Sequence, residues 1–135
     1  RVHIHGTMLQ NGSSSDRTLT FRIKYGASTI IGDITAAIPR NALARAFALD
    51  VWLAGNGATN AQTASAKLEY SAISNASVAG TGDLATTEFV PGQTLVGTSA
   101  VDSTAAQTFS VTTVTSAAAG TQTFTRMYAI AELVK

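Results

Sequence analysis

The feature that most constrains this chain is a two-residue alternation of apolar and polar side chains that recurs along most of its length. It is cleanest over residues 18–25, where four large apolar side chains alternate with Thr, Arg and Lys. A side-chain period of two is typical of a β-strand with one buried and one exposed face. The same rhythm predicts further strands over residues 2–8, 29–38, 64–73, 107–116 and 121–134.

Residues 41–50 are the one segment in which a helix competes with a strand, because Ala and Leu are strong helix formers. The alternation nevertheless continues through Val51, Trp52 and Leu53. The run Gly55-Asn56-Gly57 then has the composition of a hairpin loop. We therefore predict a strand over residues 41–54 that ends in a turn at 55–57.

Strand count and turn spacing indicate the fold class. Clusters of turn-forming residues separate the strands at 11–16, 26–28 and 117–120. Residues 74–93 are rich in small residues, and we expect a long loop or irregular crossover there, with a short strand near 88–90. About eight strands in 135 residues predict an all-β fold, an antiparallel two-sheet sandwich of the jelly-roll type, in one domain spanning 1–135. Its predicted core comprises Leu19, Phe21, Ile23, Leu49, Val51, Phe109 and Val111.

Charge is scarce. Nine Lys and Arg oppose eight Asp and Glu, and a net charge of +1 gives no long-range attraction to nucleic acid or an anionic membrane. No apolar run approaches the ~20 residues that span a bilayer. Charged residues make up 13% of the chain, about half the roughly 25% of soluble domains. A surface with so few charges favours association, so we expect copies of this chain or other subunits to cover part of it.

The last predicted strand is where we expect that association. Over residues 121–134 one face carries Phe124, Tyr128 and Ile130, and the other carries Met127, Ala129 and Leu133. The opposing sheet covers one face, and a neighbouring copy is the simplest cover for the other. The predicted oligomer interface comprises Phe124, Met127, Tyr128 and Leu133.

Metal and cofactor binding have little support. His3 and His5 share one face of a strand, and two imidazoles at that spacing are able to share a metal ion. The chain has no cysteine, and no carboxylate neighbours the pair in sequence. We therefore expect a polar sheet face with no metal and no cofactor, and His3 and His5 are the only candidates for metal ligands.

Catalytic motifs are missing as well. The sequence contains neither Gly-X-Ser-X-Gly nor His-Glu-X-X-His. A glycosidase would need two carboxylates at one cleft, whereas we expect Arg45 with Asp50, and Lys67 with Glu69, to form surface or intersubunit ion pairs. The chain is therefore not expected to be an enzyme.

Carbohydrate binding is the competing possibility, because jelly rolls host lectin sites. A sugar platform would use Trp52 or Tyr70 beside Asn56. Packing of Trp52 on an outer face or at an interface is the favoured alternative.

Three segments resemble a known family: Arg22–Gly26, Arg45–Leu53 and Val101–Val111, the last followed by a Thr-rich hairpin and a final strand ending Glu132-Leu133-Val134. In this order they resemble the jelly-roll domains of tailed-bacteriophage virion proteins, namely head fibres, capsid decoration spikes and tail-fibre tips. The resemblance implies a homotrimer around a threefold axis, located on the virion and attached to other capsid or tail proteins. It leaves a tip that binds a host-surface glycan as the alternative function.

Overall fold

A computed structural model describes residues 1–10, 17–38, 41–72, 88–90, 93–115 and 122–133. These residues form strands and turns, so the predicted all-β class is confirmed. No helix among them is long and apolar enough to cross a membrane. The strands are β1 (Val2–Gln10), β2 (Arg17–Tyr25), β3 (Ser28–Ile38), β4 (Asn41–Ala58), β5 (Ala61–Ala72), β6 (Glu88–Val90), β7 (Thr94–Ser99), β8 (Phe109–Thr115) and β9 (Gln122–Ala131).

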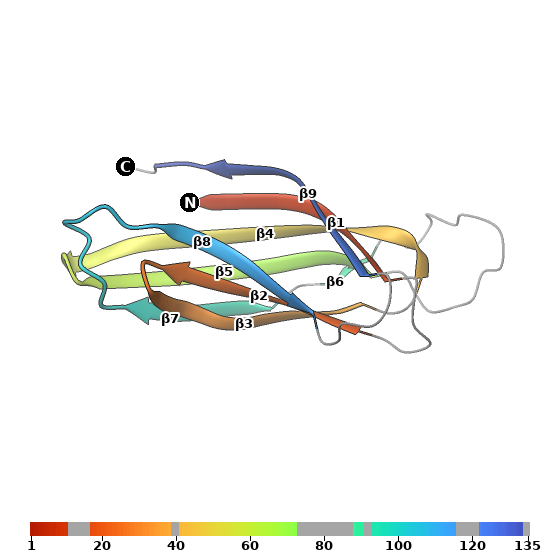
Figure 1. Cartoon of the computed structure of the whole chain (residues 1–135), viewed down its shortest axis with the longest axis horizontal. Coiled ribbons are helices and arrows are strands. Elements are labelled where there is room, and N and C mark those ends of the chain that lie inside the picture. The colour runs from red at the N-terminus through yellow and green to blue at the C-terminus, as the bar shows by residue number, and fades with distance from the viewer. Residues whose placement is uncertain (11–16, 39–40, 73–87, 91–92, 116–121, 134–135) are drawn as a thin grey trace.

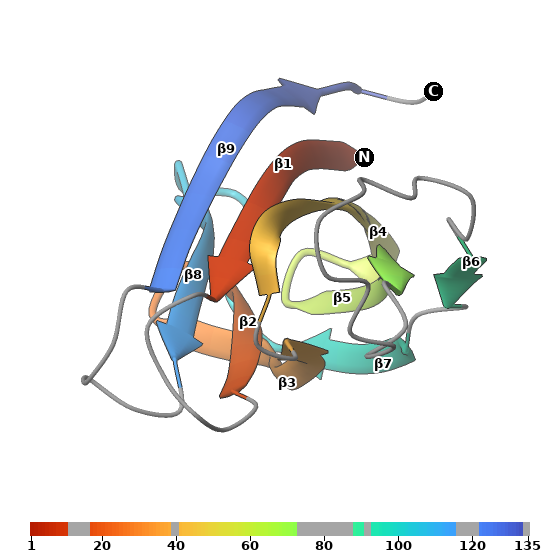
Figure 2. The ribbon, with the colours of Figure 1, turned by 90° about the vertical axis from the view of Figure 1, so that its right-hand side faces the viewer.

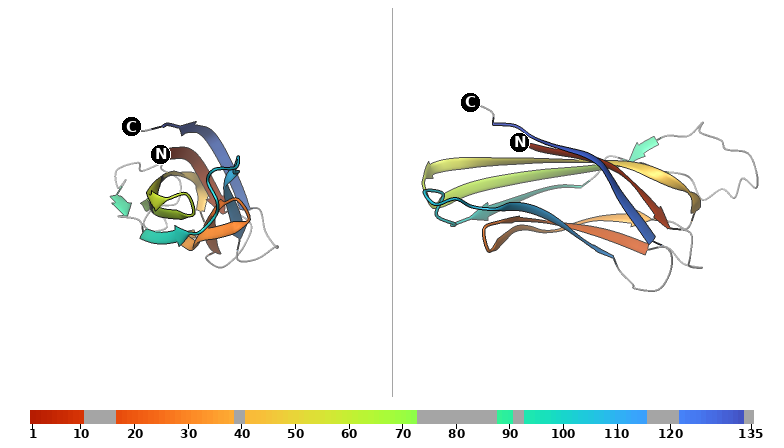
Figure 3. Two further views of the ribbon diagram at one scale, coloured as in Figure 1. Left: turned by 90° about the vertical axis from the view of Figure 1, so that its left-hand side faces the viewer. Right: turned by 45° about the horizontal axis from the view of Figure 1, so that its top comes forward.

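The strands form two antiparallel sheets that pack face to face. The larger sheet has the order β6-β5-β4-β1-β9, and β7 also pairs with β5. The smaller sheet has the order β3-β2-β8. The long hairpins β4–β5 and β2–β3 run along the longest axis of the molecule (Figure 1; Figure 3, right). The predicted two-sheet sandwich of about eight strands is thus confirmed, and residues 41–50 belong to a strand as expected.

The β4–β5 hairpin turns later than predicted. Strand β4 continues through Gly55-Asn56-Gly57, and the turn lies at Thr59 and Asn60. Gly57 has a φ of 77°, a left-handed conformation that glycine adopts without a steric penalty. The pairing with β5 is irregular there, between Gly55 and Ala58, so the glycines distort the strand instead of ending it.

Strand β7 is absent from the sequence-based prediction, whereas the short strand near 88–90 is confirmed as β6. Gly97 lies at the centre of β7, where its backbone packs against β3. A Cβ at Gly97 would lie 2.8 Å from the carbonyl carbon of Ile30 and 3.2 Å from Cγ1 of Ile31. Strand β7 therefore closes one side of the sandwich against β3. The predicted turns at 11–16 and 117–120, and the predicted loop over 74–87, lie outside the described residues.

The core lies between the sheets where the alternation predicts it. Five of the seven predicted core side chains are at most 1% exposed: Leu19, Phe21, Ile23, Leu49 and Val51. Phe109 and Val111 are only half-buried, because β8 is an edge strand. Phe21 packs against Phe47 and Phe124 with ring centroids 5.5 and 5.7 Å apart, which joins β2, β4 and β9.

The faces of β9 differ from the prediction. Gly6 of β1 pairs with Arg126, and the preceding His5 pairs with Tyr128, so Met127 is an extra residue in a β-bulge. The bulge reverses the alternation. Phe124 consequently packs into the core, whereas Tyr128 lies against His5 on the outer face, so the expectation that these two share a face is wrong.

The opposite side of the sandwich is open. Figure 2 shows the larger sheet curving from β9 through β1, β4 and β5 to β7, which lies beside β3 (also Figure 3, left). Strands β9 and β8 end their respective sheets on the other side and do not pair with each other among the described residues. We call the region between β8 and β9 the open side.

Candidate functional site

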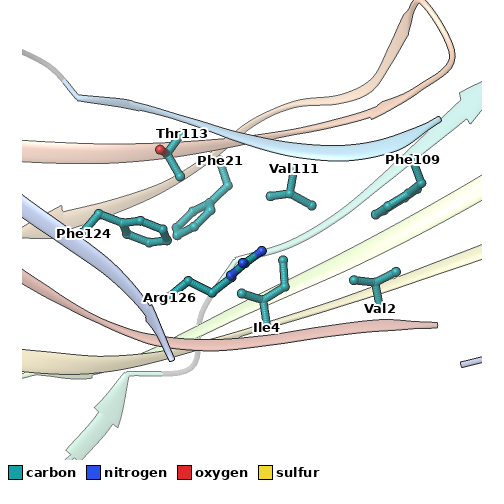
Figure 4. Close-up of a pocket in the computed structure, with 8 residues that line it drawn as sticks. All are labelled: Val2, Ile4, Phe21, Phe109, Val111, Thr113, Phe124 and Arg126. Carbon is teal, nitrogen blue, oxygen red and sulfur yellow. The ribbon is translucent and has the colours of Figure 1, made fainter. Parts of the chain in front are cut away.

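The open side contains an apolar groove that penetrates between the sheets. One cavity of about 220 Å³ is lined by six apolar residues together with Thr113 and Arg126 (Figure 4). A second cavity of about 320 Å³ continues toward Leu133, and both are lined by Val2 and Phe109. The groove therefore exposes side chains of β1, β8 and β9 that a closed sandwich would bury.

Three charged residues line this groove. The Arg126 side chain extends between the sheets beside Ile4 (Figure 4). Arg1 and Glu132 line the second cavity. Sequence reasoning assigned Arg126 no role, although alternation places it on the same face of β9 as Phe124, two residues earlier and ahead of the bulge at Met127.

Strand β9 and Leu133, which follows it, also present apolar side chains to solvent. Met127 is 69% exposed and Leu133 is 88% exposed, and Tyr128 and Ile130 are exposed as well. Three of the four predicted interface residues are thus accessible in a single chain. The fourth, Phe124, stacks on Phe47 at 4.9 Å and is half-buried in the core cluster.

A second group of residues lies on the outer face of the larger sheet, and we call it the outer-face cluster. Strand register assembles it, because His3 lies opposite Asp50 of β4, and His5 lies opposite Tyr128 of β9. Alternation places both histidines on the face away from the core, as predicted. The members of the cluster are Arg1, His3, His5, Asp50, Trp52 and Tyr128.

Asp50 is the acceptor at the centre of this cluster. Its Oδ1 lies 2.5 Å from Nδ1 of His3 and accepts hydrogen bonds from Nη2 of Arg1 at 2.9 Å and Nε at 3.2 Å. Burial raises the pKa of Asp50, but the hydrogen bonds and positive charge from His3 and Arg1 outweigh it and hold the pKa below its ordinary value of 3.8. Asp50 is therefore ionised at neutral pH.

The two histidines contact each other through their Nε2 atoms. The ring of His5 stacks on Tyr128, with centroids 4.7 Å apart and planes 12° apart. No group of three or more potential metal ligands occurs among the described residues, so one chain brings only this pair together. The chain of contacts from Asp50 through His3 to His5 was not predicted, because it depends on the register between β1 and β4.

The residues proposed for a sugar platform do not gather at one place. Trp52 is exposed on the outer face, where the guanidinium of Arg1 lies 4.8 Å from its ring centroid. Tyr70 packs against the core on the opposite face. Asn56 is exposed four residues along β4, roughly 13 Å from Trp52 at about 3.3 Å per residue. Tyr128 is the aromatic residue that shares the outer face with Trp52.

One of the two predicted ion pairs is confirmed, and the other is wrong. Lys67 and Glu69 form an exposed pair at 2.5 Å. Arg45 does not pair with Asp50, because an odd spacing along β4 places them on opposite faces, and Arg45 is buried on the core face. Asp50 and Glu69, two of the carboxylates that a glycosidase could use, lie diagonally across β4 and β5, and neither lines the two cavities described above.

Comparison of the chain with protein-family models, with curated proteins and with solved structures gave no match.

Proposed function

We propose that this chain is a virion structural protein, the trimeric jelly-roll head of a bacteriophage capsid fibre, decoration spike or tail fibre. The observation that supports it best is the open side, where β9 exposes apolar side chains next to an apolar groove. The role is structural and not enzymatic.

The state of the β9 edge favours self-association. Proteins that remain monomeric usually protect an edge strand with charges, Pro, a β-bulge or a cover. Strand β9 has the bulge at Met127 and the charge of Arg126, so we expect the contact to use its exposed apolar side chains and not continuous strand pairing. Residues 122–131 contain neither Lys nor Pro, and among the described residues β1 is the only strand that pairs with β9. A second copy that docks here buries Met127 and Leu133 and excludes water from the groove.

The proposed threefold symmetry comes from the family resemblance, and the geometry of the open side is compatible with it. Strand β9 belongs to one sheet and β8 to the other, so a contact from β9 of one copy to β8 of the next joins two different surfaces. Such heterologous contacts form a closed ring when the rotation between copies closes. Three copies then cover three open sides.

Imaging tests the virion assignment. An antibody fragment against this domain should label intact particles at threefold-symmetric projections of the head or tail. Localisation of the chain in infected cells but never on purified particles would contradict the proposal, whatever its oligomeric state.

Binding of a host-surface glycan is the second candidate, and exposure of Trp52 is the observation that favours it. An indole ring on an open sheet face is a stacking surface for a pyranose. A glycan array probed with wild type and Trp52→Ala separates the candidates: specific binding that the substitution abolishes supports a receptor-binding tip. If protein shown to be folded binds no glycan on the array, the receptor-binding candidate is contradicted and the structural role is the one that stays.

A further inference from the structure

We propose that His3 and His5 form a bidentate site for a divalent transition-metal ion such as Cu²⁺, with Asp50 as the residue that orients it. The inference does not depend on the proposed assembly, because one chain supplies all three side chains.

Convergence of the two imidazoles is the first argument. The two histidines are separated by one residue on β1, so their side chains lie on the same face. Their ring centroids are 4.2 Å apart, and the Nε2 atoms are in contact. Two nitrogens bound to one ion at 2.0–2.1 Å lie about 3 Å apart. Small side-chain rotations therefore admit an ion between them.

The tautomer of His3 is the second argument. Oδ1 of Asp50 lies 2.5 Å from Nδ1 of His3, and a carboxylate oxygen accepts the hydrogen bond, so in a neutral imidazole Nδ1 carries the proton and Nε2 keeps its lone pair. This carboxylate–imidazole arrangement orients metal-bound histidines in many proteins and raises their basicity. The stack of His5 on Tyr128 holds the second ring in place.

The ligand set selects the class of metal. Two imidazoles without thiolates or a local cluster of carboxylates suit Cu²⁺, Ni²⁺ or Zn²⁺ better than Ca²⁺ or Mg²⁺. Cu²⁺ binds nitrogen ligands most tightly in this series. Water or another ligand would complete the coordination sphere.

Copper titration tests the site, since the chain has only two histidines and no cysteine. The α-amino group of Arg1 must be acetylated in the protein used. A free amine two residues before His3 would itself chelate Cu²⁺, together with the intervening backbone amides and the imidazole of His3. Calorimetry should give one Cu²⁺ per chain, and pulsed electron paramagnetic resonance should detect two imidazole nitrogens. His3→Gln and His5→Gln should each leave one imidazole and lose saturable binding at concentrations that saturate wild type.

Two further variants complete the experiment. Asp50→Asn should weaken Cu²⁺ binding about 10–100-fold, as expected for loss of an orienting carboxylate. Glu69→Gln removes another carboxylate from the same face and should leave the affinity unchanged. Retained binding in either histidine variant, one ion shared by several chains, or no saturable binding by folded protein would overturn the site. Equal affinity in Asp50→Asn would overturn the part assigned to Asp50.

Discussion

At Gly97 the backbone of β7 lies against the carbonyl group of Ile30 on β3, and a side chain larger than hydrogen has no space. Gly97→Ala should therefore destabilise the fold by about 1–3 kcal/mol, because the sheets must separate locally to admit a methyl group. Gly32→Ala is the matched control, since a Cβ there has no neighbour within 4 Å, and its effect should stay within about 0.5 kcal/mol. Urea denaturation measures both. Equal free energies of unfolding would contradict the close packing of β7 on β3.

Asp50 predicts a pH dependence of stability. Its pKa is lower in the folded chain than in the unfolded one, so its contribution is full above the ordinary value of 3.8 and disappears as pH falls through the folded pKa. Asp50→Asn should lower the free energy of unfolding by about 1 kcal/mol at pH 7, allowing for partial exposure. Urea titrations from pH 7 to pH 3 should show the difference from wild type shrinking below about pH 4. A constant difference would argue against the ion pair of Asp50 with Arg1.

Sequence alternation correctly predicted which face of a strand many individual side chains occupy. Alternation placed Phe21 and Leu49 in the core and His3 on the outer face, because a strand has two sides. It did not predict the contact of His3 with Asp50, which lie 47 positions apart and meet only through the register between β1 and β4. Neighbours across two strands depend on the pairing register, and the alternation within each strand does not determine that register.

Among the strands, β8 and β2 of the smaller sheet differ in the burial of their aromatic residues. Phe21 of β2 is fully buried between Phe47 and Phe124, so Phe21→Ala should cost about 3–5 kcal/mol. Phe109 of β8 borders the groove and is half-buried, so Phe109→Ala should cost about half as much. Chemical denaturation of both variants under identical conditions checks the ratio. The ratio applies to dissociated chains, because the proposed trimer covers β8 and should raise the cost for Phe109→Ala. Equal costs measured in dissociated chains would contradict the half-burial of Phe109.

Two features of the strands were beyond prediction from alternation. The bulge at Met127 adds one residue to β9 and reverses its faces, and nothing in the local composition marks that position. Strand β7 contains Gly97 and small Thr and Ser residues, so its apolar signal is weak. Close packing on β3 requires glycine at position 97, and a glycine has no side chain to contribute to the apolar–polar alternation.

For the whole molecule, the central claim is that the open side is an interface between copies. Scarce charge and an apolar β9 led us to expect association from the sequence alone. Within the residues that it describes, the structure has an unpaired edge beside an apolar groove, which supports the proposal. The edge and the groove arise together, because the larger sheet curves onto β3 on one side only.

Sedimentation equilibrium at micromolar concentration tests this claim most directly. Wild type should have three times the 13.9 kDa mass of the chain, and Met127→Glu should be monomeric or insoluble, because it places a charge in the apolar contact. Val96→Glu is the matched control, since Val96 of β7 is also 69% exposed but lies away from β9, and it should remain trimeric. A wild-type chain that stays monomeric throughout this range, or equal dissociation of the Met127 and Val96 variants, would contradict the account.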